Sequence, residues 1–138
     1  MTEYEVKEKL EQARNLKREL LAKERLLEEL RTRAEKTTPT LSDLPKAQSN
    51  GSRVESFAIL IVELGLDIEE YSIELVNAIQ DAESLIRIET DALKRSILTD
   101  YYLNRLSVAR IAEQEHYSDR RIWQLLSEAR RDIARMIS

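Results

Sequence analysis

The sequence contains no cysteine, a single histidine, and only two glycines and two prolines in 138 residues. Without cysteine the chain forms no disulfide and carries no thiolate chemistry, and one histidine, His116, leaves no multi-histidine metal site within a chain. No apolar run approaches the roughly 20 residues that cross a bilayer, and the first residues lack the apolar core of a signal peptide. We therefore expect a soluble, cytoplasmic protein with no metal, no cofactor and no membrane contact.

Catalytic motifs are missing as well. The chain has no Ser-His-Asp order, no glycine-rich phosphate loop and no His-Glu-x-x-His pattern. Its 26 acidic residues show no recognisable pairing of a general acid with a general base. The sequence therefore predicts that the protein is not an enzyme.

The composition instead favours helices, because glutamate, lysine, arginine, leucine and alanine dominate and phenylalanine occurs once. Both prolines and one of the two glycines fall within residues 37–53, which have no helical periodicity and are interpreted as a linker. We expect an all-α protein in which a long helical hairpin or coiled-coil stalk precedes a C-terminal head. Its expected parts are an N-terminal amphipathic helix at 1–36, the linker at 37–53, a long coiled-coil-like helix at 54–90 and the head at 91–138.

The two long segments carry apolar seams of the kind that pairs helices. In the first, an apolar residue recurs every seven positions from Val6 to Ala34. The second alternates spacings of three and four, which is typical of a coiled coil. Its predicted helix-pairing seam consists of Val54, Phe57, Ile61, Leu64, Ile68, Tyr71 and Leu75. An antiparallel hairpin within one chain and pairing between chains both remain open, and we expect a homo-oligomer formed through the long helices.

Charge is distributed unevenly along the chain. The net charge is −4, but residues 1–36 carry +1, residues 54–104 carry −8 and residues 105–138 carry +2, with arginine as the only base in the last segment. Local charge is a better guide to nucleic-acid binding than the total. The C-terminal charge permits a DNA partner.

The C-terminal segment, from about Leu103 to Ile137, predicts a helix-turn-helix. A short helix over 108–115 follows Ser107 as N-cap, and Ser118 caps a last helix that begins at Asp119. Two core positions, Ile111 and Ala112, belong to the short helix. The inner face of the last helix is predicted to consist of Ile122, Leu125, Leu126, Ala129, Ile133 and Ile137.

The other side of the last helix is polar and rich in arginine. One α-helix fits the B-DNA major groove, where the first turns meet base edges and neighbouring residues bind phosphates. The candidates for base reading are Asp119, Arg120, Trp123, Gln124 and Ser127. The candidates for phosphate contact are Ser107, Arg110, Ser118, Arg121, Arg130 and Arg131. For Trp123, a core position and an exposed binding role remain open.

These residues carry a resemblance. The segment LSVARIAEQEHYSDRRIWQLLSEARRDI resembles region 4 of bacterial sigma factors, without insertion or deletion. Nearly the whole chain resembles the ArpU/RinA-like late transcriptional regulators of phages of Gram-positive bacteria, through its N-terminal helix, TTPTLSDLP connector, RVE start and YL…IA…YS head. The resemblance implies promoter binding and control of phage late genes in a bacterial host cell. His116 stands where the motif usually has glycine, and Trp123 replaces a polar or basic reader.

Two other functions fit the sequence. The sigma-like head could occupy a surface of bacterial RNA polymerase without reading bases, which an acidic chain with Trp123 on the recognition face would suit. Alternatively, the −8 segment could mimic nucleic acid and inhibit a host-defence protein.

Overall fold

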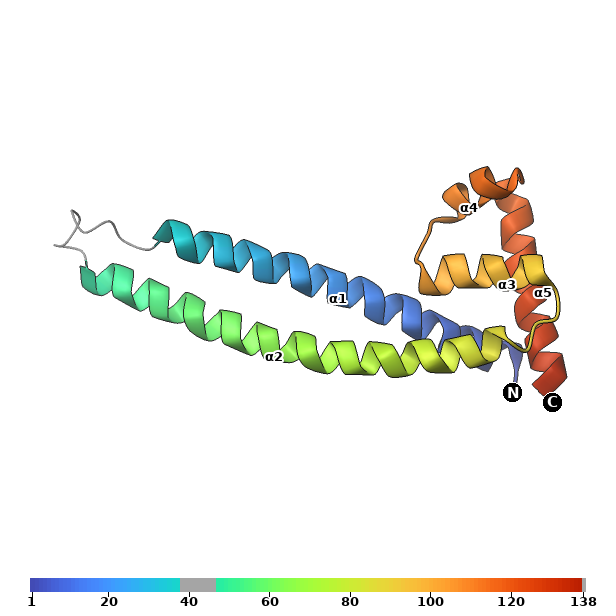
Figure 1. The fold of residues 1–138 in the computed structure, drawn as a ribbon, viewed down its shortest axis with the longest axis horizontal. Coiled ribbons are helices and arrows are strands. Elements are labelled where there is room, and N and C mark those ends of the chain that lie inside the picture. The colour runs from blue at the N-terminus through green and yellow to red at the C-terminus, as the bar shows by residue number, and fades with distance from the viewer. Residues whose placement is uncertain (38–46, 138) are drawn as a thin grey trace. The chain divides into compact units, whose positions relative to one another are not determined.

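The computed structural model describes residues 1–37 and 47–137, with side chains described for 1–36 and 53–137. Every regular element in these ranges is helical, which confirms the predicted all-α class. Residues 38–46 of the predicted linker lie outside the described residues. The elements are α1 (Glu3–Thr37), α2 (Ala47–Ile86), α3 (Ala92–Leu98), the π-helical η2 (Thr99–Leu103), α4 (Val108–Glu115) and α5 (Asp119–Ile137) (Figure 1).

The bounds of α2 differ from those that the sequence predicts. The helix begins at Ala47, so the second part of the predicted 37–53 linker is helical. Proline does not fit in the interior of a helix, and Pro45 is the last proline in the sequence. After Pro45, extending the helix by one more residue costs little free energy. The helix ends at Ile86 and not near residue 90, because the chain turns at Arg87 and Ile88.

The described chain forms two compact units. One, here called the head unit, combines residues 1–18 with residues 74–137. The other, the hairpin unit, spans Glu19–Ile73. The head unit is therefore larger than the predicted 91–138 head, because it also contains the beginning of α1 and the end of α2.

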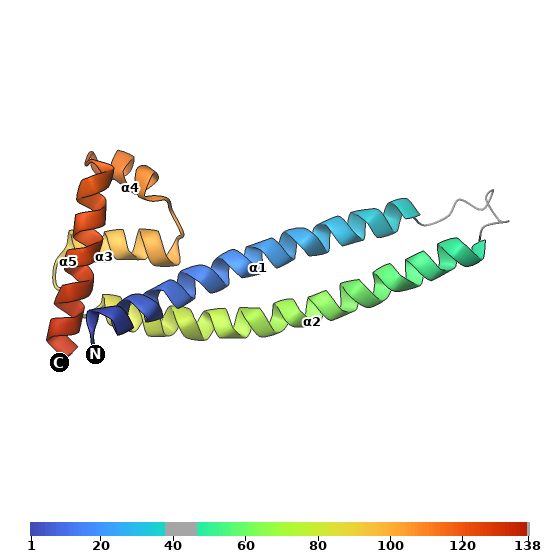
Figure 2. The ribbon, with the colours of Figure 1, turned by 180° about the vertical axis from the view of Figure 1, so that it is seen from behind.

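In the hairpin unit, α1 and α2 run antiparallel and side by side (Figures 1 and 2). Lys23 Nζ lies 2.6 Å from Asp67 Oδ2 and 4.7 Å from the centre of the Tyr71 ring. The hydrogen bond to Asp67 raises the pKa of Lys23. Closer to the C-terminal end of α1, Leu26 and Leu30 line a groove together with Leu60 and Leu64 of α2. Here the α2 seam meets α1 of the same chain.

The predicted seam residues, from Val54 to Leu75, are all half-buried. The seam continues into the head unit, where Ala78, Ala82 and Leu85 are buried. The spacing of three and four therefore identified the face of α2 that packs.

The core of the head unit draws on both ends of the chain. Val6, Leu10 and Ala13 of α1 belong to the same buried cluster as residues of α3, α4 and α5. Two basic side chains of α1 also bind carbonyl oxygens of η2: Arg14 Nε donates to Tyr101 O at 3.1 Å, and Lys17 Nζ donates to Leu103 O at 2.9 Å. The start of α1 is thus an integral part of the head unit.

No helix in the described parts of the chain combines the length and the apolar character that a membrane span requires.

Candidate nucleic-acid interface

α4 begins and ends where the sequence predicts. Ser107 is its N-cap, and the Ser107 hydroxyl accepts a hydrogen bond from Arg110 N at 3.1 Å. His116 ends the helix with left-handed backbone angles, φ 60° and ψ 40°. A residue in this conformation ends a helix abruptly. The next helix can therefore start only three positions later.

Ser118 sets the start of α5 in the same way. Its hydroxyl accepts a hydrogen bond from Arg121 N at 3.1 Å, and Asp119 places a negative charge in the first turn, where the helix dipole favours it. Both predicted serine caps are confirmed. They fix the register of α5, and with it the direction in which each α5 side chain points.

The inner face of α5 is buried as predicted. Ile122, Leu125, Leu126, Ala129 and Ile133 are each at most 3% exposed. They share one cluster with Ile111 and Ala112 of α4 and Ile97 and Leu98 of α3. Ile137, the last residue of α5, is 36% exposed, so its predicted core position is wrong and the apolar stripe ends at Ile133.

The outer face of α5 exposes most of the predicted base readers. Asp119, Arg120, Trp123 and Gln124 are exposed, whereas Ser127 is half-buried. Arg120 and Gln124 lie one helical turn apart on this face. Among the predicted phosphate contacts, the exposed residues are Ser107, Arg110, Ser118, Arg121 and Arg131.

Trp123 combines the two roles that the sequence leaves open. Half of its surface is exposed, at 50%. One side contacts the Tyr101 ring edge to face, with 5.7 Å between ring centres, and the guanidinium of Arg14 lies 4.3 Å from the centre of that Tyr101 ring. The indole is therefore anchored to the head unit while part of it remains available to a partner.

Arg130 is the one predicted phosphate contact that is not exposed. It is half-buried, and its NH1 donates a hydrogen bond to Tyr102 Oη at 3.0 Å. Tyr102 is 1% exposed; burial raises the pKa of its phenol, and Arg130 opposes that rise. Arg130 therefore holds η2 against α5, and we do not include it in the proposed interface.

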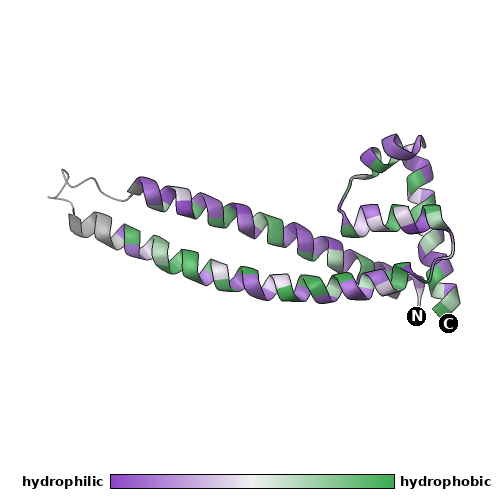
Figure 3. Ribbon diagram, in the orientation of Figure 1, coloured by the Kyte–Doolittle hydropathy of each residue, from purple (hydrophilic) through white to green (hydrophobic). Residues whose placement is uncertain are grey.

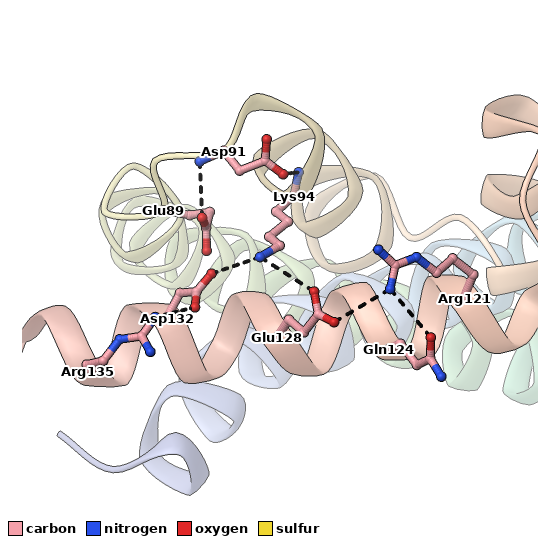
Figure 4. Close-up of polar contacts among 8 residues, drawn as sticks. All are labelled: Glu89, Asp91, Lys94, Arg121, Gln124, Glu128, Asp132 and Arg135. Carbon is pink, nitrogen blue, oxygen red and sulfur yellow. Dashed lines mark hydrogen bonds and ion pairs between the residues drawn. The ribbon is translucent and has the colours of Figure 1, made fainter.

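A polar network joins the outer face of α5 to α3 (Figure 4). Lys94 Nζ of α3 lies 3.1 Å from Asp132 and 3.5 Å from Glu128, and the hydrogen bond to Asp132 raises the pKa of Lys94. Glu128 also pairs with Arg121 NH1 at 3.5 Å. Glu128 thus holds one of the exposed arginines by a long ion pair.

Next to this network lies a buried carboxyl group. Glu89 is 1% exposed, and its Oε1 accepts a hydrogen bond from Asp91 N at 3.1 Å. Its Oε2 is buried and has no hydrogen-bond partner among the described residues. The neighbouring Asp132 carboxylate adds to the effect of burial on the pKa of Glu89.

The pKa values of these two carboxyl groups are shifted in opposite directions. Burial raises the pKa of Glu89. Burial also acts against the charged form of Asp132, but the hydrogen bond from Lys94 and the positive charges of Lys94 and Arg135 oppose it, and the pKa of Asp132 is lowered. Of the two carboxyl groups, Glu89 therefore favours the protonated form and Asp132 the charged form.

The sequence analysis missed Arg14, Lys17 and Glu89. The two basic residues bind carbonyl oxygens that are 87 and 86 positions away in the sequence. No local sequence pattern predicts such a contact. The burial of Glu89 has no signal either. The Asp91 N-cap, whose side chain accepts from Lys94 N, is the one feature near Glu89 that an N-cap search could have found.

No group of three or more histidine or acidic side chains in the described ranges could hold a metal ion. No protein-family model, curated protein or solved structure matches the chain.

Proposed function

We propose that this protein is a sequence-specific DNA-binding transcription regulator that inserts the start of α5 into the major groove. One observation carries the proposal: two serine-capped helices joined by a short turn bury the inner face of α5 and leave Arg120 and Gln124 exposed on its first turns. A helix held in this way matches the size of the major groove.

The exposed side chains suit two kinds of contact. Arginine binds guanine and glutamine binds adenine through paired hydrogen bonds, so Arg120 and Gln124 would read bases. Arg110, Arg121 and Arg131 would neutralise phosphates. The hydroxyls of Ser107 and Ser118 accept from backbone N–H groups and keep their own proton to donate.

The resemblance to ArpU/RinA-like regulators extends the proposal to a phage-encoded activator or repressor of late genes, acting as an oligomer in a bacterial host. The exposed arginines support DNA binding in general. The particular genes and the direction of regulation rest on the resemblance. The oligomer would need a face other than the α2 seam, which meets α1 of the same chain.

The test begins by selecting preferred duplexes from a random library with the full chain. Fluorescence anisotropy then compares the selected duplex with a scrambled one. Arg120→Ala should weaken the selected duplex roughly 5- to 150-fold and relax preference at one base position. Arg131→Ala should weaken both duplexes alike and lower the salt slope by about one.

Arg18→Ala is the matched control, because it removes the same charge from an exposed position on α1. It should bind both duplexes like the parent. If the parent does not discriminate between the duplexes, or if Arg120→Ala and Arg131→Ala both behave like Arg18→Ala, the proposal is wrong.

A second function is favoured by the 50% exposure of Trp123, because tryptophan is enriched at the centres of protein interfaces. In this alternative, the head unit docks on bacterial RNA polymerase and does not read bases. Purified polymerase would then retain the parent chain but not Trp123→Ala, while no duplex is retarded. Retarded duplexes without polymerase capture would exclude this alternative.

A further inference from the structure

α2 carries a second apolar row besides its seam. Ile59 is 53% exposed, Val62 62%, Leu66 58% and Ile73 65%. We call these four residues the outer row. They follow spacings of three, four and seven, so they share one face of the helix. All four lie in the hairpin unit.

The outer row cannot be covered by α1 of the same unit. At 3.6 residues per turn, these positions lie nearly opposite the seam, and seam residues such as Leu64 and Tyr71 are the ones that meet α1. A surface helix normally carries polar residues on the side away from its partner. Figure 3 shows instead that much of α2 is hydrophobic, whereas most of α1 is hydrophilic.

The acidic residues around the outer row indicate what kind of partner could bind there. From Val54 to Ile86 the sequence holds eight acidic residues and no basic one. Glu63 and Glu70 border the row on one side, Glu69 lies within it, and all three are exposed. Two copies of this face would bring like charges together, which disfavours pairing. DNA is excluded for the same reason.

We propose that the outer row is a docking site for an amphipathic helix of another protein, with apolar residues spaced by three and four and lysine or arginine beside them. The apolar stripe would bury the outer row, and the basic residues would pair with Glu63, Glu69 and Glu70. This site is distinct from the proposed DNA interface and does not depend on it.

The test uses three labelled synthetic helices of about three heptads with leucine and isoleucine at the a and d positions. The first has lysine at e and g, the second has glutamate there, and the third keeps the lysines but scrambles the apolar positions. Anisotropy with the full chain should show binding of the first peptide alone. Saturation at or below about 100 μM is expected, which is a weak but specific affinity.

Variants then locate the site. The double substitution Val62→Ser/Leu66→Ser should weaken the first peptide at least about tenfold. Glu63→Gln/Glu70→Gln should weaken it and flatten its salt dependence. Leu26→Ser is the matched control: Leu26 is 46% exposed on α1 of the same unit, and its loss should leave binding unchanged. Circular dichroism checks that each variant keeps its helices.

Several results would overturn the proposal. One is equal binding of the first and scrambled peptides, another is no binding by the parent, and a third is an equal loss in the Leu26→Ser control. Sedimentation equilibrium supplies an independent readout. If the parent is a dimer that Val62→Ser/Leu66→Ser converts into a monomer, a second copy occupies the outer row and the basic partner is excluded.

Discussion

At the scale of single residues, two backbone positions stand out. Arg105 and His116 both have φ of 60°, although neither is glycine. This left-handed conformation costs an ordinary residue about 1–2 kcal/mol. His116 adopts it because the chain must leave α4 and start α5 within three positions, and the buried faces of both helices hold it there.

Replacing His116 by glycine should therefore raise the free energy of unfolding. The expected gain is about 0.5–1 kcal/mol, because the extra freedom of glycine in the unfolded chain offsets part of the relieved strain. Urea denaturation measures the change. His116→Ala is the control, since it removes the exposed imidazole and keeps the Cβ atom. Equal gains in both variants would show that the strain is not in the backbone.

Glu89 makes stability depend on pH. Its pKa is raised in the folded protein, so the folded state binds this proton more tightly than the unfolded chain. The contribution of Glu89 is thus fully present below its unfolded pKa and is lost as the pH rises through the folded value. Glu89→Gln keeps a polar side chain of similar size and does not titrate. Its stability relative to the parent should increase from about pH 4 to pH 8. Thermal unfolding across this pH range measures the difference.

Asp132→Asn should show the opposite dependence of stability on pH. Because the pKa of Asp132 is lowered, its contribution is present above the unfolded pKa and is lost as the pH falls. Asp132→Asn should destabilise the protein most at neutral pH. Parallel pH profiles for Glu89→Gln and the parent would contradict a raised pKa of Glu89 in the folded protein.

At the scale of elements, α5 carries opposed charges on its outer face. Glu128 lies 3.5 Å from Arg121 and also pairs with Lys94. If the protein binds DNA as proposed, the Glu128 carboxylate would repel phosphate groups and keep Arg121 from contacting them. Lys94 keeps Asp132 as its partner when Glu128 is replaced, so the packing of α3 on α5 should survive.

Glu128→Gln should therefore bind duplex DNA several-fold more tightly than the parent. The gain should be similar for selected and scrambled duplexes and should shrink as salt is added, because it is electrostatic. Anisotropy titrations at two salt concentrations provide the measurement. Glu24→Gln is the control, since it removes one exposed carboxylate from α1 of the hairpin unit. A gain limited to the selected duplex would point to base reading by the new amide.

The elements also show where sequence patterns succeed. Ser107 and Ser118 are followed by apolar residues at helical spacing, and both caps form where this local pattern places them. The start of α2 was missed because residues 47–53 have no apolar periodicity. Helix extension there needs no periodic stripe, since adding a residue to an existing helix forms one more hydrogen bond.

At the scale of the whole molecule, the head unit needs a segment from the far end of the chain. Leu10 of α1 is 0% exposed in the same cluster as the α5 residues. Leu10→Ala should lower the stability of the head unit by about 2–5 kcal/mol. Trp123, the only tryptophan, lies in this unit and reports its unfolding by fluorescence in urea.

Leu26→Ala provides the control for this experiment, because Leu26 is 46% exposed and belongs to the hairpin unit. It should leave the tryptophan transition nearly unchanged. If Leu10→Ala also leaves it unchanged, the first turns of α1 do not contribute to the fold that presents α5.

The sequence by itself determined the helical class, the seam of α2, both serine caps and the exposure of Arg120 and Gln124 on α5. Each of these features follows from the spacing of residues within one helix or one turn, so it depends only on residues that are close together in the sequence. Only the tertiary structure decided that α1 completes the head unit, that Arg130 binds Tyr102 and that Glu89 is buried beside Asp132. These features depend on contacts between residues far apart in the chain, whose energies arise only after the helices have packed.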